Sequence, residues 1–164
     1  MPPNPLTAGG DGYGRMMAAP DDSPGFLFWR TSLHWQRAIA AALAPLDLTH
    51  AQFVLLAGLW WLDSQGEQPN QLQLARHSGT DVKMTSQVLR RLEDKGLLTR
   101  VTDPSDTRAK RLGITPAGAE LATEAVATVE ATDAAFFGAA PDQEALLAAL
   151  RTLALPPAGP PADA

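Results

Sequence analysis

Four polar side chains recur along one stretch of the chain at intervals of three and four residues. They are Lys83, Ser86, Gln87 and Arg90. On a helix this spacing brings all four onto one face. Lys and Arg side chains pair with the edge of guanine and Gln pairs with the edge of adenine, so such a face suits the major groove of double-stranded DNA. The pattern predicts a DNA-contacting helix, although ordinary surface helices carry similar polar mixtures.

A second group of charged residues follows closely in the sequence. Its cations are Arg100, Arg108, Lys110 and Arg111. Asp106 precedes Arg108 by two residues, and on an extended segment both side chains point the same way, so the carboxylate can orient the guanidinium. The alternative is an exposed salt bridge of little energetic value. We expect Arg108, Lys110 and Arg111 to contact DNA, with Asp106 in support.

The charge of the chain is unevenly distributed. The 164 residues carry a formal net charge of -5. Residues 76–111 nevertheless hold nine Lys and Arg against five Asp and Glu, while the remainder holds four against thirteen. A cationic patch on an acidic body favours one docking orientation toward a polyanion. A solvated charged surface is the alternative interpretation of the same counts.

The apolar residues predict the elements that must position these side chains. Apolar spacing at i, i+3, i+4 and i+7 gives a buried side to a helix that starts at Thr80 or Asp81 and ends near Lys95. The residues of that side are Thr85, Val88, Leu89 and Leu92. A shorter helix precedes it, with the capping pair Asn70 and Gln73 at its start and Ser78 and Gly79 as its stop. A short helix, a turn and a second helix form a helix-turn-helix.

The hydrophobic period changes to two after Gly96. Residues 97–102 and 108–114 alternate as strands around a turn at 103–105. Such a hairpin, directly after the DNA-contacting helix, is a wing. Upstream, Thr49 and Gln52 form a capping box before an almost wholly apolar helix, which we expect to be central and buried.

The remaining segments complete a mainly α (α+β) architecture, a winged helix-turn-helix domain with a two-stranded wing. Proline and glycine predict flexible tails at 1–22 and 156–164 around one domain at 23–155, with the DNA-binding part at 49–115. We expect helices at 23–44, 116–139 and 141–154 to form a dimerisation layer. A two-fold dimer would place two recognition helices roughly 34 Å apart on a pseudo-palindromic site. Long helices packed within a monomer are the alternative.

Residues 103–118 resemble the wing signature of the MarR family of transcription regulators. Asp106 and Arg108 match its Asp-x-Arg, and Ile114, Thr115 and Gly118 match its aliphatic-Thr-x-x-Gly. The resemblance covers nearly all of 23–153 and implies that Arg108 enters the minor groove. Residues 82–85 depart from the family's usual small polar run, so its base preference does not carry over. Met84 flanks the contact face and either packs against a thymine methyl or, as we favour, shields the helix end.

The resemblance also implies a small aromatic or phenolic ligand, bound between the dimerisation helices and the winged domain. The candidate lining residues are Trp29, Arg30, His34, Arg37 and Trp60. Aromatic residues at helical spacing are more often part of a core, and that alternative stays open. Together these patterns predict a homodimeric, sequence-specific repressor that a small molecule releases from DNA. The alternative is a winged-helix protein-interaction module without DNA binding, which the acidic total favours.

Several function classes are excluded or disfavoured. The chain has no cysteine, which excludes disulfides and thiol chemistry. Its three histidines, His34, His50 and His77, lack metal-site spacing, and we find no catalytic constellation or Gly-rich phosphate loop. We therefore expect no metal, no cofactor and no enzymatic activity. The longest apolar stretch, near 53–62, is too short to span a bilayer, so we expect no membrane association and a cytoplasmic location.

Overall fold

The computed structural model describes residue 19 and residues 22–104 and 110–154. The chain divides into two compact units, 1–38 and 39–164, and the boundary falls within helix α1 (Pro24–Leu43). In the first unit, the Ser23 hydroxyl lies 3.4 Å from the Phe26 amide nitrogen, as expected for a residue that caps the helix start. The large apolar side chains of Phe26, Leu27, Phe28 and Trp29 are exposed.

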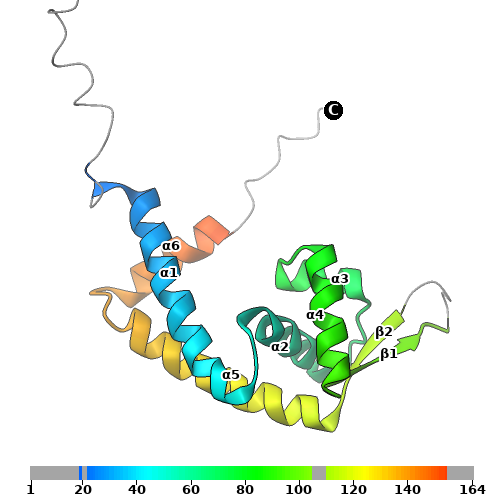
Figure 1. Ribbon diagram of the computed structural model, residues 1–164. Helices are drawn as coiled ribbons and strands as arrows, with labels where there is room; N and C mark the ends of the chain where they lie inside the picture. The colour runs from blue at the N-terminus through cyan, green and yellow to red at the C-terminus, as the bar shows by residue number, and fades with distance from the viewer. Residues whose placement is uncertain (1–18, 20–21, 105–109, 155–164) are drawn as a thin grey trace, which may run out of the picture. The chain divides into compact units, whose positions relative to one another are not determined.

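The second unit is built around helix α2 (His50–Ser64), as Figure 1 shows. The Thr49 hydroxyl accepts from the Gln52 amide, and the Gln52 side chain accepts from the Thr49 amide, which confirms the predicted capping box. Leu55, Leu56 and Leu59 are fully buried. Four other elements contact α2, so the predicted central position of this helix is confirmed. They are α3 (Gln71–Ser78), α4 (Val82–Asp94), α5 (Pro116–Phe137) and β2 (Lys110–Ile114).

The predicted helix-turn-helix consists of α3 (Gln71–Ser78) and α4 (Val82–Asp94). Asn70 and Gln73 form a reciprocal capping box, and Gly79 ends α3 in the left-handed conformation with φ 64°. Asp81 caps α4 by accepting from the Met84 amide at 2.9 Å. Thr85, Leu89 and Leu92 are fully buried, as their spacing predicted. Val88, predicted for the same side, is only half-buried.

The wing consists of β1 (Leu98–Thr102) and β2 (Lys110–Ile114), paired antiparallel with Leu98 opposite Ile114 and Thr102 opposite Lys110. The first strand begins one residue later than predicted, because the Leu97 amide still bonds to the Leu92 carbonyl as part of the turn that ends α4. Asp106 and Arg108 lie outside the described residues.

Strand β2 has a further partner that the sequence did not indicate. The Leu112 amide donates to the Pro69 carbonyl at 2.9 Å, and Asn70 forms an antiparallel bridge with Arg111. Because Asn70 also caps α3, this pairing joins the wing directly to the start of the helix-turn-helix.

Helix α5 (Pro116–Phe137) follows the wing through a tight junction. The Thr115 hydroxyl accepts from the Gly118 amide at 3.0 Å and donates to the Gly96 carbonyl at 2.7 Å. A Cβ at Gly118 would lie 1.9 Å from the Leu97 carbonyl oxygen. The Thr-x-x-Gly pattern thus has a structural reason, since the Thr caps α5 and the Gly admits the backbone that ends α4.

Helix α6 (Gln143–Ala154) begins two residues later than the predicted start at 141. The Asp142 carboxylate accepts from the Ala145 amide at 2.9 Å, so Asp142 caps the helix and Pro141 precedes it. Likewise α5 ends at Phe137 rather than at 139, and α1 spans Pro24–Leu43 rather than 23–44, because the predicted ranges included flanking residues.

No single helix in the described part of the chain is both long and apolar enough to cross a membrane, although Pro24–Leu46 and His50–Ser64 together reach that length and composition as a bent pair.

Candidate nucleic-acid interface

The outer face of α4 carries the side chains predicted to contact DNA. Lys83, Gln87 and Arg90 are exposed and Ser86 is half-buried, while Thr85 and Leu89 on the other side are fully buried. Neither Lys83 nor Arg90 forms an ion pair within residues 22–104 and 110–154. Neither cation is therefore paired with a carboxylate from this part of the chain.

A buried hydroxyl network holds the start of α4 against the end of α3. The Thr85 hydroxyl donates to the Asp81 carbonyl at 2.7 Å and lies 2.8 Å from the Thr80 hydroxyl. Thr85 is fully buried, so loss of these bonds would leave unsatisfied polar groups in the core. These hydrogen bonds connect the first turn of α4 to the loop that joins it to α3.

The hairpin places two cations that are neighbours in the sequence, Lys110 and Arg111, on opposite faces. Successive residues of a strand point to opposite faces, so Lys110 and Arg111 lie on opposite sides of the wing. Lys110 lines a cavity of about 420 Å³ together with residues of α3, α4 and β1. Its lining residues are Asn70, Gln71, Leu72, Val82, Arg100, Lys110 and Leu112. Lys110 therefore lies on the same side of the wing as the start of α4.

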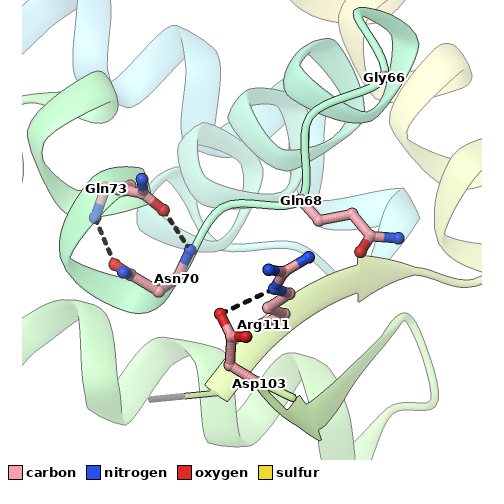
Figure 2. Close-up of a pocket in the computed structure, with 6 residues that line it drawn as sticks. All are labelled: Gly66, Gln68, Asn70, Gln73, Asp103 and Arg111. Carbon is pink, nitrogen blue, oxygen red and sulfur yellow. Dashed lines mark hydrogen bonds and ion pairs between the residues drawn. The ribbon is translucent and has the colours of Figure 1, made fainter. Parts of the chain in front are cut away.

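Arg111 lies on the other side of the wing and has an internal partner. Its Nε lies 2.8 Å from Oδ2 of Asp103, whose side chain is only 15% exposed (Figure 2). The hydrogen bond and the charge of Asp103 together raise the pKa of the Arg111 guanidinium. The pair borders a second cavity of about 320 Å³, which Gly66, Gln68 and Gln73 help to line.

Arg100 is also paired within the fold. Its Nε lies 2.8 Å from Oε2 of Glu93 on α4, and the Arg100 side chain is 14% exposed. Both described strand arginines thus have carboxylate partners, whereas Lys110 forms no ion pair with another described residue. Spacing along the sequence did not indicate either pairing.

A contact between residues far apart in the sequence joins the other end of α4 to the segment before α2. The Lys95 Nζ donates to the Asp47 carbonyl and lies 2.9 Å from Asp47 Oδ2. Asp47 adopts a left-handed conformation with φ 52° in the linker between α1 and α2. Its partner is 48 residues away, so no local pattern predicts the contact.

The predicted ligand-binding residues fall into both units. Trp29, Arg30, His34 and Arg37 belong to the 1–38 unit, while Trp60 is half-buried on α2 in the 39–164 unit. The Arg30 guanidinium lies over the Phe26 ring at 5.6 Å. Each residue is placed only within its own unit, so the pocket stays a prediction.

Burial lowers the pKa of His50 from its ordinary value, and the negative charge of Asp133 opposes part of that shift. The imidazole stacks on Phe53 with ring centroids 6.5 Å apart.

Among the described residues, no group of three or more His, Asp or Glu side chains is arranged to hold a metal ion.

Sequence comparison with known proteins finds one family model and several transcriptional regulators that resemble this chain. The MarR family model matches residues 48–110, the part that contains α2, α3, α4 and β1 and ends at the first residue of β2. An uncharacterised HTH-type transcriptional regulator of Bacillus subtilis, YdcH, is 43% identical over 136 residues, covering 83% of this chain and 92% of the relative. The HTH-type transcriptional repressor Rv2887 of Mycobacterium tuberculosis is 37% identical over 119 residues, covering 72% and 83% respectively.

Two solved structures share the fold at comparable coverage. CouR from Rhodococcus jostii, bound to p-coumaroyl-CoA, is 30% identical, has a TM-score of 0.72 and covers 85% of this chain and 97% of its own. A mutant MarR from E. coli complexed with operator DNA is 25% identical, has a TM-score of 0.68 and covers 80% and 93%.

Proposed function

The chain belongs to the MarR family, and on this premise we propose that it is a homodimeric, sequence-specific DNA-binding transcriptional repressor, released from its operator by a small molecule. We propose no enzymatic role, because its relatives are transcriptional regulators, and we propose a cytoplasmic location for a protein that works on DNA.

One observation carries the proposal. The exposed row of Lys83, Gln87 and Arg90 on α4 lies in a helix-turn-helix followed directly by a wing, and none of its cations is neutralised within the described residues. A recognition helix with unpaired cations and an amide supplies both phosphate contacts and base contacts. The MarR structure complexed with operator DNA supports the same use of the fold.

Residues 49–115 are the proposed DNA-binding part. In addition to Lys83, Gln87 and Arg90 on α4, we propose that Ser86 on α4 and Lys110 on β2 contact DNA. Arg108 is the proposed minor-groove residue, and Asp106 its support, from their match to the family signature; both lie outside the described residues. Arg111 remains a proposed DNA-contacting residue, but its pairing with Asp103 favours a smaller share of the phosphate binding than that of Lys110.

The proposed dimerisation layer comprises α1, α5 and α6. Apolar side chains remain exposed on α1 and on α6, where Leu147 is 48% and Leu153 is 76% exposed. Within the second unit, a cavity of about 460 Å³ between α5 and α6 is lined by Phe137, Leu146, Leu147 and Leu150, among others. Exposed apolar faces of this kind are favoured at subunit interfaces. A second copy would bury them and call for a pseudo-palindromic operator.

Release by a small aromatic or phenolic molecule is the remaining part of the proposal. CouR, which shares the fold, was solved bound to p-coumaroyl-CoA. The candidate ligand-binding residues stay Trp29, Arg30, His34, Arg37 and Trp60. The dimer would have one conformation that fits the operator and another in which the recognition helices do not fit it. A ligand that binds the second conformation more tightly would lower DNA affinity, at most by the difference between its binding free energies for the two conformations.

Fluorescence anisotropy tests the proposal. The probe is the promoter region adjacent to the chain's own gene, the control is a scrambled duplex of equal length, and both are titrated at several salt concentrations. We expect preference for the promoter and an affinity that falls steeply with salt, because phosphate neutralisation releases counterions. Absent or salt-insensitive binding to both duplexes would favour the protein-interaction module instead.

A further inference from the structure

Two exposed apolar side chains lie beside the polar face of α4. Val82, the first residue of α4, is 44% exposed, and Leu72, near the start of α3, is 43% exposed. Both line the cavity of about 420 Å³ that Lys110 borders from the wing. The Gln71 side-chain amide lies 3.4 Å from the Val82 carbonyl, which connects the two helix starts at this point. We call Leu72 and Val82 the apolar pair.

The surroundings of the apolar pair are polar and cationic. Lys110 lies across the same cavity, and Lys83 follows Val82 directly on the exposed side of α4. Helix geometry places Val82 at the boundary between Ser86 of the polar face and Leu89 of the buried side, and in this first turn of α4 Val82 stays 44% exposed. The pair therefore lies at the border of the surface that would face a polyanion, beside the cavity that Lys110 lines.

The major groove of DNA offers one apolar group that matches such a pair. Thymine presents its 5-methyl there, and apolar side chains contact it. The first residues of a recognition helix are the ones that reach base edges. A phosphate held by Lys110 across the cavity would keep the strand close enough for a base of that strand to meet Val82.

We propose that Leu72 and Val82 read a thymine through its 5-methyl group in each half of the operator. This inference rests on the proposed DNA-binding function and adds a base-specific contact at the start of α4. The amide and cations of the α4 row then read neighbouring bases and phosphates, so specificity combines one apolar contact with hydrogen bonds.

The experiment uses DNA that differs only in the methyl group. The full chain selects a binding duplex from a random pool, and the enriched duplex is prepared with thymine or with uracil at every thymine position. Uracil keeps all hydrogen-bonding groups and the charge of thymine but lacks the methyl. We expect the uracil duplex to bind about fourfold more weakly for each methyl buried, or about sixteenfold for two half-sites, since one buried methylene contributes about 0.8 kcal/mol.

Two variants test whether Leu72 and Val82 cause the loss of affinity for the uracil duplex. In Val82→Ala and Leu72→Ala, we expect the ratio of affinities for thymine and uracil duplexes to fall toward one. Val101→Ala is the matched control, because Val101 is 62% exposed and lies on the opposite face of the wing from Lys110. That variant should keep the ratio of the unmodified protein. Replacing single thymines with uracil should then locate one sensitive position in each half-site.

The possible failures are distinguishable. Specific, salt-dependent binding with equal affinity for thymine and uracil duplexes would overturn the methyl contact and leave the proposed function standing. The same conclusion would follow if Val82→Ala and Leu72→Ala kept the full ratio, since the loss would then arise from DNA shape or from other residues. Failure to enrich any duplex would overturn both proposals.

Discussion

At the scale of single residues, the availability of a charge depends on its partners inside the fold. Lys110 and Arg111 are neighbours in the sequence, yet only Arg111 has a carboxylate partner, Asp103 at 2.8 Å. Arg100 is likewise paired with Glu93. An ion pair within the protein lowers the net charge that a guanidinium can present to phosphate, so adjacent cations need not contribute equally to DNA binding.

Lys110→Ala and Arg111→Ala should therefore differ in their effect on salt dependence. We expect Lys110→Ala to lower the slope of log affinity against log salt concentration by about one, as for one lost phosphate contact. Arg111→Ala should change the slope less and lower the thermal midpoint more, because the Asp103 carboxylate, whose side chain is 15% exposed, loses its charge-assisted hydrogen bond to Arg111. Anisotropy titrations and thermal unfolding measure both quantities. Equal slopes in the two variants would contradict this division of roles.

His50 gives the stability of the fold a defined pH dependence. Burial lowers its pKa in the folded state, so the unfolded chain binds the proton more readily and stability falls as the pH drops through the ordinary His pKa. We expect the thermal midpoint to fall less between about pH 7 and about pH 5 in His50→Gln than in the unmodified chain. Thermal unfolding monitored by circular dichroism at both pH values tests this. An equal fall in both proteins would argue against a lowered pKa at His50.

At the scale of elements, one junction couples the recognition helix, the wing and α5. The Thr115 hydroxyl donates to the carbonyl of Gly96, in the turn that follows α4, and caps α5 by accepting from the Gly118 amide. The Thr115 amide also donates to the Leu97 carbonyl at 3.1 Å. A displacement of α5 would therefore reach the end of α4 through hydrogen bonds, without passing through the side-chain core.

Gly118→Ala should disrupt this junction. The added Cβ would lie 1.9 Å from the Leu97 carbonyl oxygen, so backbone must move, and overpacking of this kind costs about 1–3 kcal/mol. Chemical denaturation should show a lower free energy of unfolding. Gly25→Ala is the matched control, since nothing lies within 4 Å of its added Cβ and it lies within helix α1. There we expect equal or higher stability. Full stability of Gly118→Ala would show that the junction can relax without cost.

At the scale of the whole molecule, the chain has a cationic region and exposed apolar side chains. The chain as a whole is acidic, with a formal net charge of -5, yet residues 76–111 carry a cationic excess. Separately, α1 and α6 expose apolar side chains that a monomer has no reason to expose, such as Phe28 and Leu153. DNA matches the first surface and a second copy of the chain matches the others.

Substitution of these apolar side chains should weaken the dimer without unfolding the protomer. Phe28 is 64% exposed, so Phe28→Ser should leave the thermal midpoint of the isolated protomer almost unchanged while raising the dissociation constant of the dimer. Sedimentation equilibrium over a range of concentrations measures that constant. Val101→Thr, an exposed site on the wing, is the control. A dissociation constant equal to that of the unmodified chain would remove Phe28 from the proposed interface.

Features that depend on residues three or four positions apart could be predicted from the sequence. These include the capping boxes of α2 and α3, the stop at Gly79, the apolar side of α4 and the Thr-x-x-Gly exit from the wing. The three-dimensional structure was needed to show that β2 pairs with Pro69, that Asp103 binds Arg111 and that Lys95 binds Asp47. Helix caps and periodicity arise from local backbone hydrogen bonding and can be read along the chain. The other contacts depend on how the elements pack against one another, and packing likewise decides which cations remain unpaired and which apolar side chains stay exposed.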